Sequence, residues 1–280
     1  MTSVPGIHKR ISALKKKGKL IGFVPTMGFL HKGHLSLIKK SKKKADITVV
    51  SIFVNPTQFA PNEDLEKYPR NLKKDKELLR NEKVDILFFP DASKIYGENF
   101  QTFVNVNKIT GILEGEFRPT HFKGVTTVVS ILFNCVKPDF AFFGQKDAQQ
   151  ATVITRMTAD LKFDTKIVVC PIIREKDGLA MSSRNVYLTE QERKDALVLS
   201  KSLKMAKSLI GNGELKSSKI LSQMKRKINS VSTSKLDYIN IVNSETFEIA
   251  KELRKGNKYF ILIACKIGKT RLIDNTLINI

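Results

Sequence analysis

Short apolar runs alternate with longer helical patterns over the first two-thirds of the chain. The apolar runs predict buried strands at residues 20–24, 47–54, 84–89, 140–143 and 166–173. The segments between them predict helices at residues 33–45, 71–81, 124–136 and 148–161. Continuous apolar strands separated by helices are typical of a parallel sheet that is covered on both faces. The pattern therefore predicts an α/β fold with a doubly wound, Rossmann-like sheet.

The pattern changes after about residue 173. Residues 174–185 are polar, rich in charge, Gly and Ser, and show no periodicity. Two Lys-rich helix patterns follow at residues 189–210 and 215–231, and alternating segments close the chain at residues 236–242, 258–266 and 270–273. Helices followed by antiparallel-looking strands indicate a smaller α+β domain. We therefore expect one domain over residues 1–173 and a second, C-terminal domain over residues 174–280.

The composition is that of a folded protein without a membrane span. Of the 280 residues, 41% are hydrophobic and 27% are charged, which is a globular composition. No apolar run approaches the ~20 residues that span a bilayer, and the start lacks the continuous apolar stretch of a secretory signal. The odd number of cysteines, Cys135, Cys170 and Cys265, all in apolar runs, predicts buried free thiols in a reducing cytoplasm and no zinc site.

The charge is strongly basic, with 49 Lys and Arg against 27 Asp and Glu and a net charge of +22. Such a balance normally raises nucleic acid as a partner. The lysines are spread through every segment, however, and few aromatic residues are interleaved with them to stack on bases. A codon bias toward Lys, Asn and Ile explains the excess at least as well. We therefore expect no nucleic-acid partner and no membrane partner.

Candidate chemistry begins where the first predicted strand enters a helix. In an open parallel sheet, ligands bind outside the carboxyl ends of the strands. Gly28 and Gly33 let the backbone approach a ligand closely, and the helix start offers N–H groups to an anion. His31 and His34 lie three residues apart at this point. Metal binding by this pair lacks a third ligand, so the Gly-bracketed histidines favour contacts with phosphate.

Four further segments carry polar residues beyond predicted strands or helices. They are residues 53–59, 118–124, 143–150 and 174–185. The first of them places Asn55 and Gln58 on either side of a proline-fixed turn, although an ordinary capped loop has the same composition. The last is Gly- and Ser-rich, which suits a segment that closes over a ligand or a flexible linker.

These segments carry a resemblance to a known family. The sequence His31-x-Gly33-His34 after a first strand resembles the signature of the nucleotidyltransferase superfamily. The longer string from Pro25 to His34, Pro-Thr-Met-Gly-x-Leu-His-x-Gly-His, is similar to that of the pantoate–β-alanine ligase family. The other four segments follow in the family's order and spacing up to residue 188.

The resemblance implies an ATP-dependent condensation of D-pantoate with β-alanine through an enzyme-bound pantoyl adenylate, with release of AMP and pyrophosphate. It also implies Mg²⁺ with the ATP and a homodimer. Two other functions share parts of the pattern. One is a different adenylyl or cytidylyl transferase, against which the paired Gln58 and Gln150 argue, since a simple transferase needs no acyl pocket. The other is an RNA-binding or tRNA-charging fragment, which would use the basic surface.

The resemblance also implies the site residues. The catalytic residues that it implies are His34, His31, Lys146 and Arg184. The ATP-binding residues that it implies are Met27, Gly28, Phe29, Leu30, His31, Lys32, Gly33, His34, Gly144, Gln145, Lys146, Asp147, Ile173, Met181, Ser182, Ser183 and Arg184. Pantoate and β-alanine would contact Asn55, Gln58 and Gln150.

Several of these residues have an expected role. Lys146 supplies a charge to the phosphates, and residues 182–184 clamp the β- and γ-phosphates. Asp147 accepts from a ribose hydroxyl. Asp75 is a candidate Mg²⁺ ligand or, equally, a solvated helix carboxylate, so we assign no metal ligand. Ala148 departs from the family, which often has an aromatic residue there.

Overall fold

The structure is a computed structural model that describes residues 1–61 and 63–280. The chain divides into two compact units. The first unit comprises Met1–Gly144 and Val153–Pro171, and the second comprises Gln145–Thr152 and Ile172–Ile280. Among the described residues, none of the helices combines the length and the apolar character that crossing a membrane requires.

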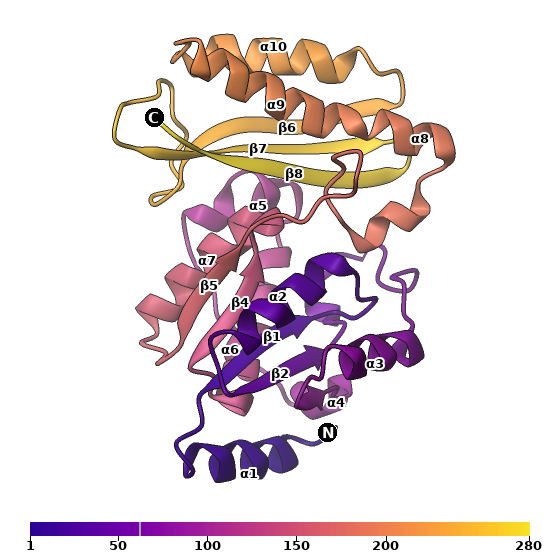
Figure 1. The fold of residues 1–280 in the computed structure, drawn as a ribbon, viewed down its shortest axis with the longest axis vertical. Helices are drawn as coiled ribbons and strands as arrows, with labels where there is room; N and C mark the ends of the chain where they lie inside the picture. Colours follow the sequence, from indigo (N-terminus) through magenta and orange to yellow (C-terminus); the bar gives the residue numbers. More distant parts are fainter. Residues whose placement is uncertain (62) are drawn as a thin grey trace. The chain divides into compact units, whose positions relative to one another are not determined.

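The first unit is built on a five-stranded parallel sheet with the strand order β3-β2-β1-β4-β5. Its strands are β1 Ile21–Thr26, β2 Ile47–Ile52, β3 Ile86–Phe88, β4 Phe140–Gly144 and β5 Lys166–Cys170. Figure 1 labels β2, β1, β4 and β5 of this sheet. The chain runs outward from β1 to β3 and then returns to the other side of β1 through β4. The order therefore reverses between β1 and β4, which is where open α/β sheets bind ligands. The predicted α/β fold class is confirmed.

Helices cover this sheet on both faces. The helices that belong to the first unit over their whole length are α1 Val4–Lys15, α2 Lys32–Lys42, α3 Leu72–Asn81, α4 Ala92–Ile95, α5 Glu114–Phe117 and α6 His121–Val136. Val24 packs in one cluster with Leu37 and Ile38 of α2, whereas the adjacent Phe23 makes an edge contact with Phe133 of α6. Because successive strand residues point to opposite faces, these two contacts place α2 and α6 on opposite sides of β1.

Between β2 and β5 the chain also forms 3-10 turns and the helix α7, which the division between the two units crosses. The turns are η1 Pro56–Gln58, η2 Ile109–Gly111 and η3 Gln145–Asp147, and α7 spans Ala148–Asp160. The predictions missed α1, in which Ile7 and Ile11 form a one-sided apolar stripe between basic residues. Its start follows ordinary rules, since the Ser3 side chain caps it and Pro5 lies in its first turn.

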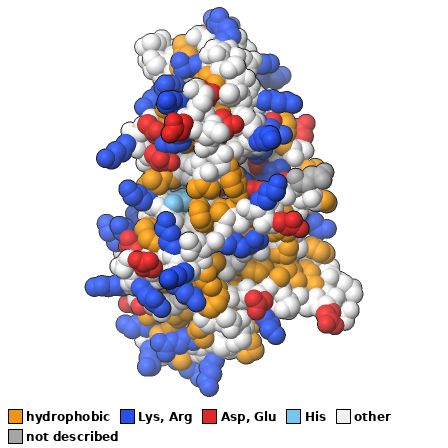
Figure 2. All heavy atoms as spheres, turned by 90° about the vertical axis from the view of Figure 1, so that its right-hand side faces the viewer, with side chains coloured by type: hydrophobic (Ala, Val, Ile, Leu, Met, Phe, Trp, Pro, Cys, Tyr) orange, Lys and Arg blue, Asp and Glu red, His pale blue; other side chains and the backbone are white. Residues whose placement is uncertain are grey.

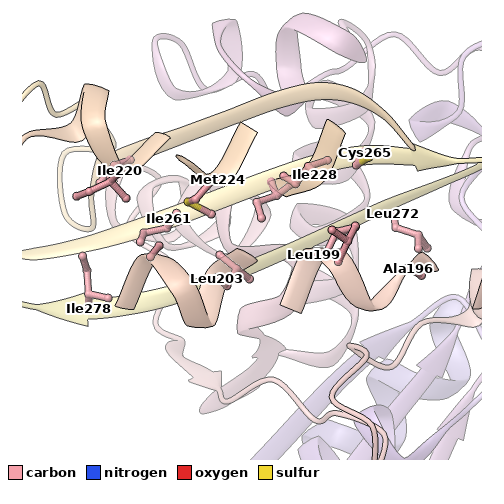
Figure 3. Packing of buried hydrophobic residues seen from close by; sticks show 14 of the residues in the cluster. Ala196, Leu199, Leu203, Ile220, Met224, Ile228, Ile261, Cys265, Leu272 and Ile278 are labelled. Atoms are coloured by element: carbon pink, nitrogen blue, oxygen red, sulfur yellow. The ribbon is translucent and has the colours of Figure 1, made fainter. Parts of the chain in front are cut away.

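The second unit contains a three-stranded antiparallel sheet with the order β6-β7-β8. Its strands are β6 Ser234–Asn243, β7 Lys258–Ile267 and β8 Thr270–Asn279, and its helices are α8 Glu190–Asp195, α9 Leu197–Gly211 and α10 Ser217–Asn229, with the turn η4 Ser183–Tyr187. The helices α9 and α10 lie side by side on this sheet (Figure 1). Leu203 and Met224 from these helices meet Ile261 of β7 in a continuous apolar core (Figure 3).

Two predictions for the second unit need correction. The helix expected at residues 189–210 is interrupted at Ala196, which separates α8 from α9. The last strand, expected at residues 270–273, continues to Asn279. The prediction ended early because Asp274 and Asn275 are poor strand formers, yet both side chains are buried in the structure.

The structure shows how the charged side chains are distributed and confirms the predicted buried free thiols. Lys and Arg side chains are scattered over the face seen in Figure 2, with acidic groups among them, instead of gathering in one patch. The three cysteines are free and buried. Burial raises the pKa of the Cys135 and Cys265 thiols to about 11, so both are protonated at neutral pH.

Candidate active site

The loop between β1 and α2 is held by the side chain of Thr26, at the end of β1, and by that of Asp75 in α3. Gly28 and Phe29 have positive φ angles of 83° and 50°, a conformation that costs little for Gly and more for Phe. The Thr26 hydroxyl accepts from Gly28 N at 3.2 Å and donates to the Ser51 carbonyl of β2 at 2.7 Å. Asp75 of α3 accepts from Phe29 N at 2.9 Å and from the next residue's N–H at 2.7 Å. The loop conformation is therefore imposed by its surroundings.

Asp75 is buried, with only 2% of its surface exposed. The interpretation of this residue as a solvated helix carboxylate is therefore wrong. The sequence pattern contained a signal for its burial, because Asp75 lies four residues before the buried Leu79 and so falls on the apolar side of α3.

His31 and His34 form a reciprocal cap at the start of α2. The His31 ring Nδ1 accepts from Gly33 N at 3.1 Å, and the His34 ring Nδ1 accepts from His31 N at 3.3 Å. The ring centroids are 4.1 Å apart. An Nδ1 that accepts a hydrogen bond carries no proton, so the hydrogen of each neutral ring is on Nε2. The cap thus assigns both histidines the tautomer that presents an Nε2–H donor.

Asn55 fixes the turn that follows β2. Its side chain is only 1% exposed, and its Oδ1 accepts from Thr57 N at 3.3 Å, from the Thr57 hydroxyl at 3.0 Å and from Tyr96 Oη at 2.7 Å. Its Nδ2 donates to the Gly124 carbonyl at 3.0 Å and to Gln58 Oε1 at 3.2 Å. Burial raises the pKa of Tyr96, while its hydrogen bonds act in the opposite direction, so this phenol remains a donor at neutral pH.

Gln58 joins the two loops at the carboxyl ends of the neighbouring strands β1 and β2. Its Nε2 donates to Met27 Sδ at 2.9 Å, and its Oε1 accepts from Asn55. The structure therefore brings together three residues that the sequence analysis assigned separately to ATP and to the acyl substrate: Met27, Asn55 and Gln58.

The segment of residues 118–124 supports Gln58 from the backbone side. His121 Nδ1 lies 3.0 Å from the Gln58 carbonyl, and Arg118 Nη2 donates to the same oxygen at 3.3 Å. Arg118 in turn forms a two-pronged ion pair with Glu63, at 2.7 and 2.6 Å. Burial alone raises the pKa of the Glu63 carboxyl, but the hydrogen bond and charge of Arg118 bring it below its ordinary value. The sequence of this segment indicated no individual role for Arg118 or His121.

Gly124 fits closely beneath the same turn. A Cβ atom at this position would lie 2.4 Å from the Thr57 carbonyl oxygen and 2.6 Å from Gln58 N. Only glycine therefore allows α6 to approach η1 as closely as it does. This close packing restricts the Gln58 backbone in addition to the contacts that His121 and Arg118 make with its carbonyl.

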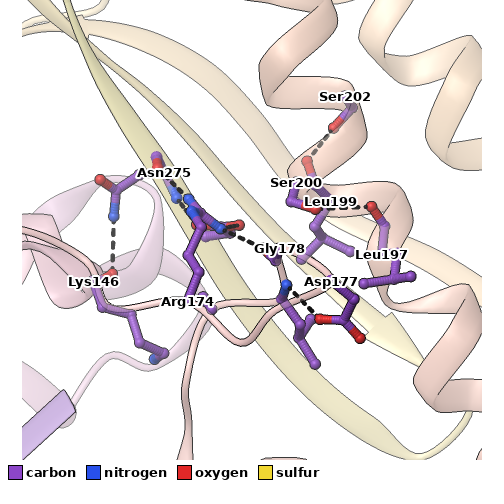
Figure 4. Close-up of polar contacts among 12 residues, drawn as sticks. Lys146, Arg174, Asp177, Gly178, Leu197, Leu199, Ser200, Ser202 and Asn275 are labelled. Atoms are coloured by element: carbon purple, nitrogen blue, oxygen red, sulfur yellow. Dashed lines mark hydrogen bonds and ion pairs between the residues drawn. The ribbon is translucent and has the colours of Figure 1, made fainter. Parts of the chain in front are cut away.

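In the second unit, Asn275 of β8 holds the segment that carries Lys146. Its Nδ2 donates to the carbonyls of Gln145 and Lys146, at 2.8 and 2.9 Å, and its Oδ1 accepts from Gln145 Nε2 at 3.2 Å. The Lys146 ammonium lies 3.5 Å from the Asp147 carboxylate. Figure 4 shows the bond from Asn275 to the Lys146 carbonyl. No sequence motif pointed to Asn275.

The segment of residues 174–185 is folded by its own hydrogen bonds. Arg174 pairs with the buried Asp274 of β8 through two bonds, at 2.7 and 2.8 Å, and donates to the Gly178 carbonyl at 3.1 Å (Figure 4). Met181 N donates to the Ile173 carbonyl at 3.0 Å, and the Ser182 hydroxyl accepts from the N–H of residue 184 at 3.3 Å. The polar composition of this segment thus provides the partners for a defined turn.

Each unit therefore carries one set of the predicted site residues. The first unit contains Met27, Gly28, Phe29, Leu30, His31, Lys32, Gly33, His34, Asn55, Gln58 and Gly144. The second unit contains Gln145, Lys146, Asp147, Gln150, Ile173, Met181, Ser182, Ser183 and Arg184. Gln150 and Ile173 are half-buried, and Ser183 is buried.

Comparison with known proteins gives a consistent result. The family model described as pantoate-beta-alanine ligase matches residues 1–277. A pantothenate synthetase of Caldicellulosiruptor bescii is 54% identical over 266 residues, covering 95% of this chain and 94% of that protein. A pantothenate synthetase of Caldicellulosiruptor saccharolyticus is 52% identical over 283 residues and covers 100% of both chains.

Solved structures agree with these sequence matches. The pantothenate synthetase of Thermus thermophilus superposes with a TM-score of 0.92 at 40% identity, over 99% of this chain and 98% of that chain. The pantoate–β-alanine ligase of Francisella tularensis, solved as a complex with "Beta-gamma ATP" and β-alanine, superposes with a TM-score of 0.80 at 38% identity, over 99% and 96% of the two chains. The chain belongs to the pantoate–β-alanine ligase family.

Proposed function

We propose that this chain condenses pantoate with β-alanine at the expense of ATP, through a pantoyl adenylate held on the enzyme. Family membership supports the overall reaction. The single observation that carries the two-step route is the arrangement at the ends of β1 and β2. Two Nε2–H donors stand at the start of α2, and an amide from the neighbouring turn reaches the same loop. Donors for a phosphate thus lie beside an amide for an acyl substrate.

In the first step, a pantoate carboxylate oxygen attacks the α-phosphorus of ATP, and the bond to the β-phosphate breaks. Two anions meet, so the enzyme acts mainly through position and charge stabilisation. His34 and His31 donate from Nε2 to the phosphate oxygens as negative charge moves to the leaving pyrophosphate. Because both Nδ1 atoms accept backbone N–H groups, the rings act as neutral hydrogen-bond donors. The loop of residues 27–33 lies against the nucleotide.

Gln58, Asn55 and Gln150 hold the acyl substrate. A neutral amide can donate to and accept from the hydroxyls of pantoate, and it leaves the carboxylate free to react. The Gln58 amide is already oriented by Asn55 and Met27. A substrate hydroxyl replaces the Met27 sulfur, which is a weak acceptor, as the partner of Gln58 Nε2.

The second unit supplies the remaining contacts to ATP. Lys146 and Arg184 bring positive charge to the phosphates, and Ser182 and Ser183 donate to the β- and γ-phosphates. Asp147 accepts from a ribose hydroxyl. Gln145, Ile173 and Met181 line the adenosine, as does Gly144 of the first unit. The anchoring of the Gln145–Lys146 carbonyls by Asn275 supports this assignment, because it leaves the Lys146 side chain on a rigid segment.

In the second step, the β-alanine amine attacks the acyl carbon of the adenylate near Gln58. The bond from that carbon to the phosphate oxygen breaks, and AMP leaves. The amine attacks in its deprotonated form, and the proton that it loses as the amide forms passes to the AMP phosphate, so the step needs no protein base.

We propose ATP as its Mg²⁺ complex, with the ion held by phosphate oxygens and water. Among residues 1–61 and 63–280, no three His, Cys, Asp or Glu side chains are grouped as metal ligands. Both Asp75 oxygens accept backbone N–H groups. The side chains of the described residues do not form a built metal site.

We also propose that the chain acts as a homodimer in the cytoplasm, on the grounds of family resemblance. Sedimentation of the purified protein at several concentrations tests the dimer. A single monomeric species at micromolar concentration contradicts it.

Pyrophosphate exchange tests the proposed route. Labelled pyrophosphate should enter ATP when pantoate is present and β-alanine is absent, and AMP should appear in stoichiometric amount only after β-alanine is added. No exchange with pantoate, but exchange with another acid, overturns the substrate. Exchange that requires β-alanine overturns the separate adenylate step.

A further inference from the structure

Asp75 and the loop before α2 form an arrangement that the proposed reaction does not use directly. The carboxylate accepts from two consecutive backbone N–H groups, those of Phe29 and Leu30, at 2.9 and 2.7 Å. It comes from α3, 45 residues further along the chain from Leu30. Leu30 directly precedes His31, the residue that caps α2.

The geometry of this loop is that of an anion-binding turn. Gly28 and Phe29 both have positive φ angles, and successive N–H groups in such turns commonly bind a phosphate or another anion. Here the anion is Asp75. A Cβ atom on Gly28 would lie 3.1 Å from Asp75 Oδ2, so glycine also gives the carboxylate room. The N–H groups of Phe29 and Leu30 already have a partner, and a bound phosphate must use other donors.

The surroundings stabilise a buried charge at this position. Asp75 lies in the first turn of α3 and is almost completely buried. The start of a helix carries partial positive charge, and two N–H bonds are added to it. An uncharged side chain would leave the part-buried N–H group of Phe29 and the buried N–H group of Leu30 without an equivalent acceptor, which is costly.

We infer that Asp75 is a positioning residue, which acts as a built-in anion and sets the β1–α2 loop so that the Nε2 atoms of His31 and His34 face the nucleotide phosphates. It is neither a metal ligand nor a group that touches substrate. Its effect on the reaction rests on the function proposed above, whereas its effect on the loop does not.

The test compares D75N and D75A with E77Q, which removes an exposed carboxylate from the same helix. Two quantities are measured for each: amide hydrogen exchange at Phe29 and Leu30, and the ATP and pantoate dependence of pyrophosphate exchange. In D75N and D75A, both amides should lose protection, and kcat for exchange should fall about 10- to 100-fold with a smaller change in KM for ATP, because the histidines are displaced and not removed. E77Q should resemble the parent in both measurements.

Sodium formate provides a rescue that a general loss of packing does not allow. In D75A, formate at high concentration should restore both amide protection and part of the exchange rate, since a small carboxylate fits the space that the side chain vacates. It should have no such effect on E77Q. If D75A does not fold, D75E provides the second variant, and it should retain amide protection because its carboxylate can still reach the loop.

Three results overturn the inference. These are unchanged amide protection in D75N, unchanged kcat in D75N despite lost protection, and a lowered affinity for Mg²⁺ with the loop amides still protected. Absence of pantoate-dependent exchange in the parent chain contradicts the proposed function instead, and the amide measurements still decide the role of Asp75 in the loop.

Discussion

The imidazole of His121 donates from Nδ1 to the backbone carbonyl of Gln58, over 3.0 Å. Gln58, whose side-chain amide we propose binds the acyl substrate, is therefore held at its backbone carbonyl by a buried ring. Burial, with the neighbouring charge of Arg118, lowers the His121 pKa to about 4, although the bond to Gln58 and the carboxylates of Glu114 and Glu63 act in the opposite direction. The ring is thus neutral across the physiological range.

This shift predicts a loss of stability in mild acid. The unfolded chain takes up a proton on His121 near pH 6.5, whereas the folded chain does so only near pH 4. Stability from this group is therefore complete above pH 6.5 and is lost as the pH falls toward 4. Between pH 7.5 and pH 5, the free energy of unfolding should drop by about 2 kcal/mol from this residue.

H121N isolates this contribution, because its Nδ2 can still donate to the Gln58 carbonyl but does not titrate in this range. Urea unfolding at pH 7.5 and pH 5 should show a smaller pH effect for the variant than for the parent. Protonation of Glu63, whose pKa is lowered in the folded chain, also reduces stability in acid. This effect is present in the parent and in H121N. Equal pH slopes for the two proteins contradict the assignment.

The reciprocal cap of His31 and His34 predicts that two substitutions at one position behave differently. In H34N, Oδ1 can replace Nδ1 as the acceptor for His31 N, but no donor remains at the Nε2 position. In H34Q, the terminal amide can donate at that position. Loss of one preorganised donor costs about 10²- to 10³-fold in kcat, so H34N should lose pyrophosphate exchange by that factor, while H34Q retains more.

The H34N variant should keep its fold within about 1 kcal/mol, because the helix cap is preserved. Thermal unfolding measures the stability of H34N, and pyrophosphate-exchange kinetics measures the activity of both variants. If H34N is the more active of the two variants, the Nε2–H donor has no role in the phosphate chemistry.

The close packing of Gly124 against η1 predicts that even a methyl group at this position disturbs the turn. In G124A, the added Cβ meets the Thr57 carbonyl oxygen at 2.4 Å, so η1 and Gln58 must shift. We expect a loss of about 1–3 kcal/mol in the free energy of unfolding and a raised KM for pantoate. G211A is the matched control, since a Cβ at Gly211 meets no atom within 4 Å. If G124A keeps the KM for pantoate of the parent chain, the contact between α6 and η1 does not set the position of Gln58 for pantoate binding.

The sequence predicts most of the sheet but little of what holds the site in place. Continuous apolar strands such as β2 are visible because both faces of the parallel sheet are covered. The His31-x-Gly33-His34 signature is local, so it needs no knowledge of the fold. Asp75 and Asn275 act on segments 45 and 129 residues away, and no local pattern records such a pairing.

Irregular local features also escaped prediction. The break at Ala196 between α8 and α9 contains neither Gly nor Pro, the usual signals of an interruption. The polar end of β8 looks unlike a strand because Asp274 and Asn275 serve Arg174 and the Gln145–Lys146 carbonyls. At buried polar positions such as Asp274 and Asn275, strand propensity therefore predicts the end of a strand where the strand continues.

The anchoring of Lys146 by Asn275 predicts an effect on ATP and not on pantoate. In N275D, the side chain can still accept from Gln145 Nε2, but it can no longer donate to the two carbonyls, and carboxylate oxygens face carbonyl oxygens instead. The segment that carries Lys146 should shift, and KM for ATP should rise about tenfold, which corresponds to one charge-assisted contact of roughly 1.4 kcal/mol.

N279D is the control for this last change, because Asn279 lies on the same strand and is exposed. Initial-rate measurements with ATP and pantoate varied separately distinguish the two substrates. An equal rise in both KM values for N275D points to a general disturbance of the second unit. Unchanged kinetics with intact stability shows that the Lys146 segment holds its position without Asn275.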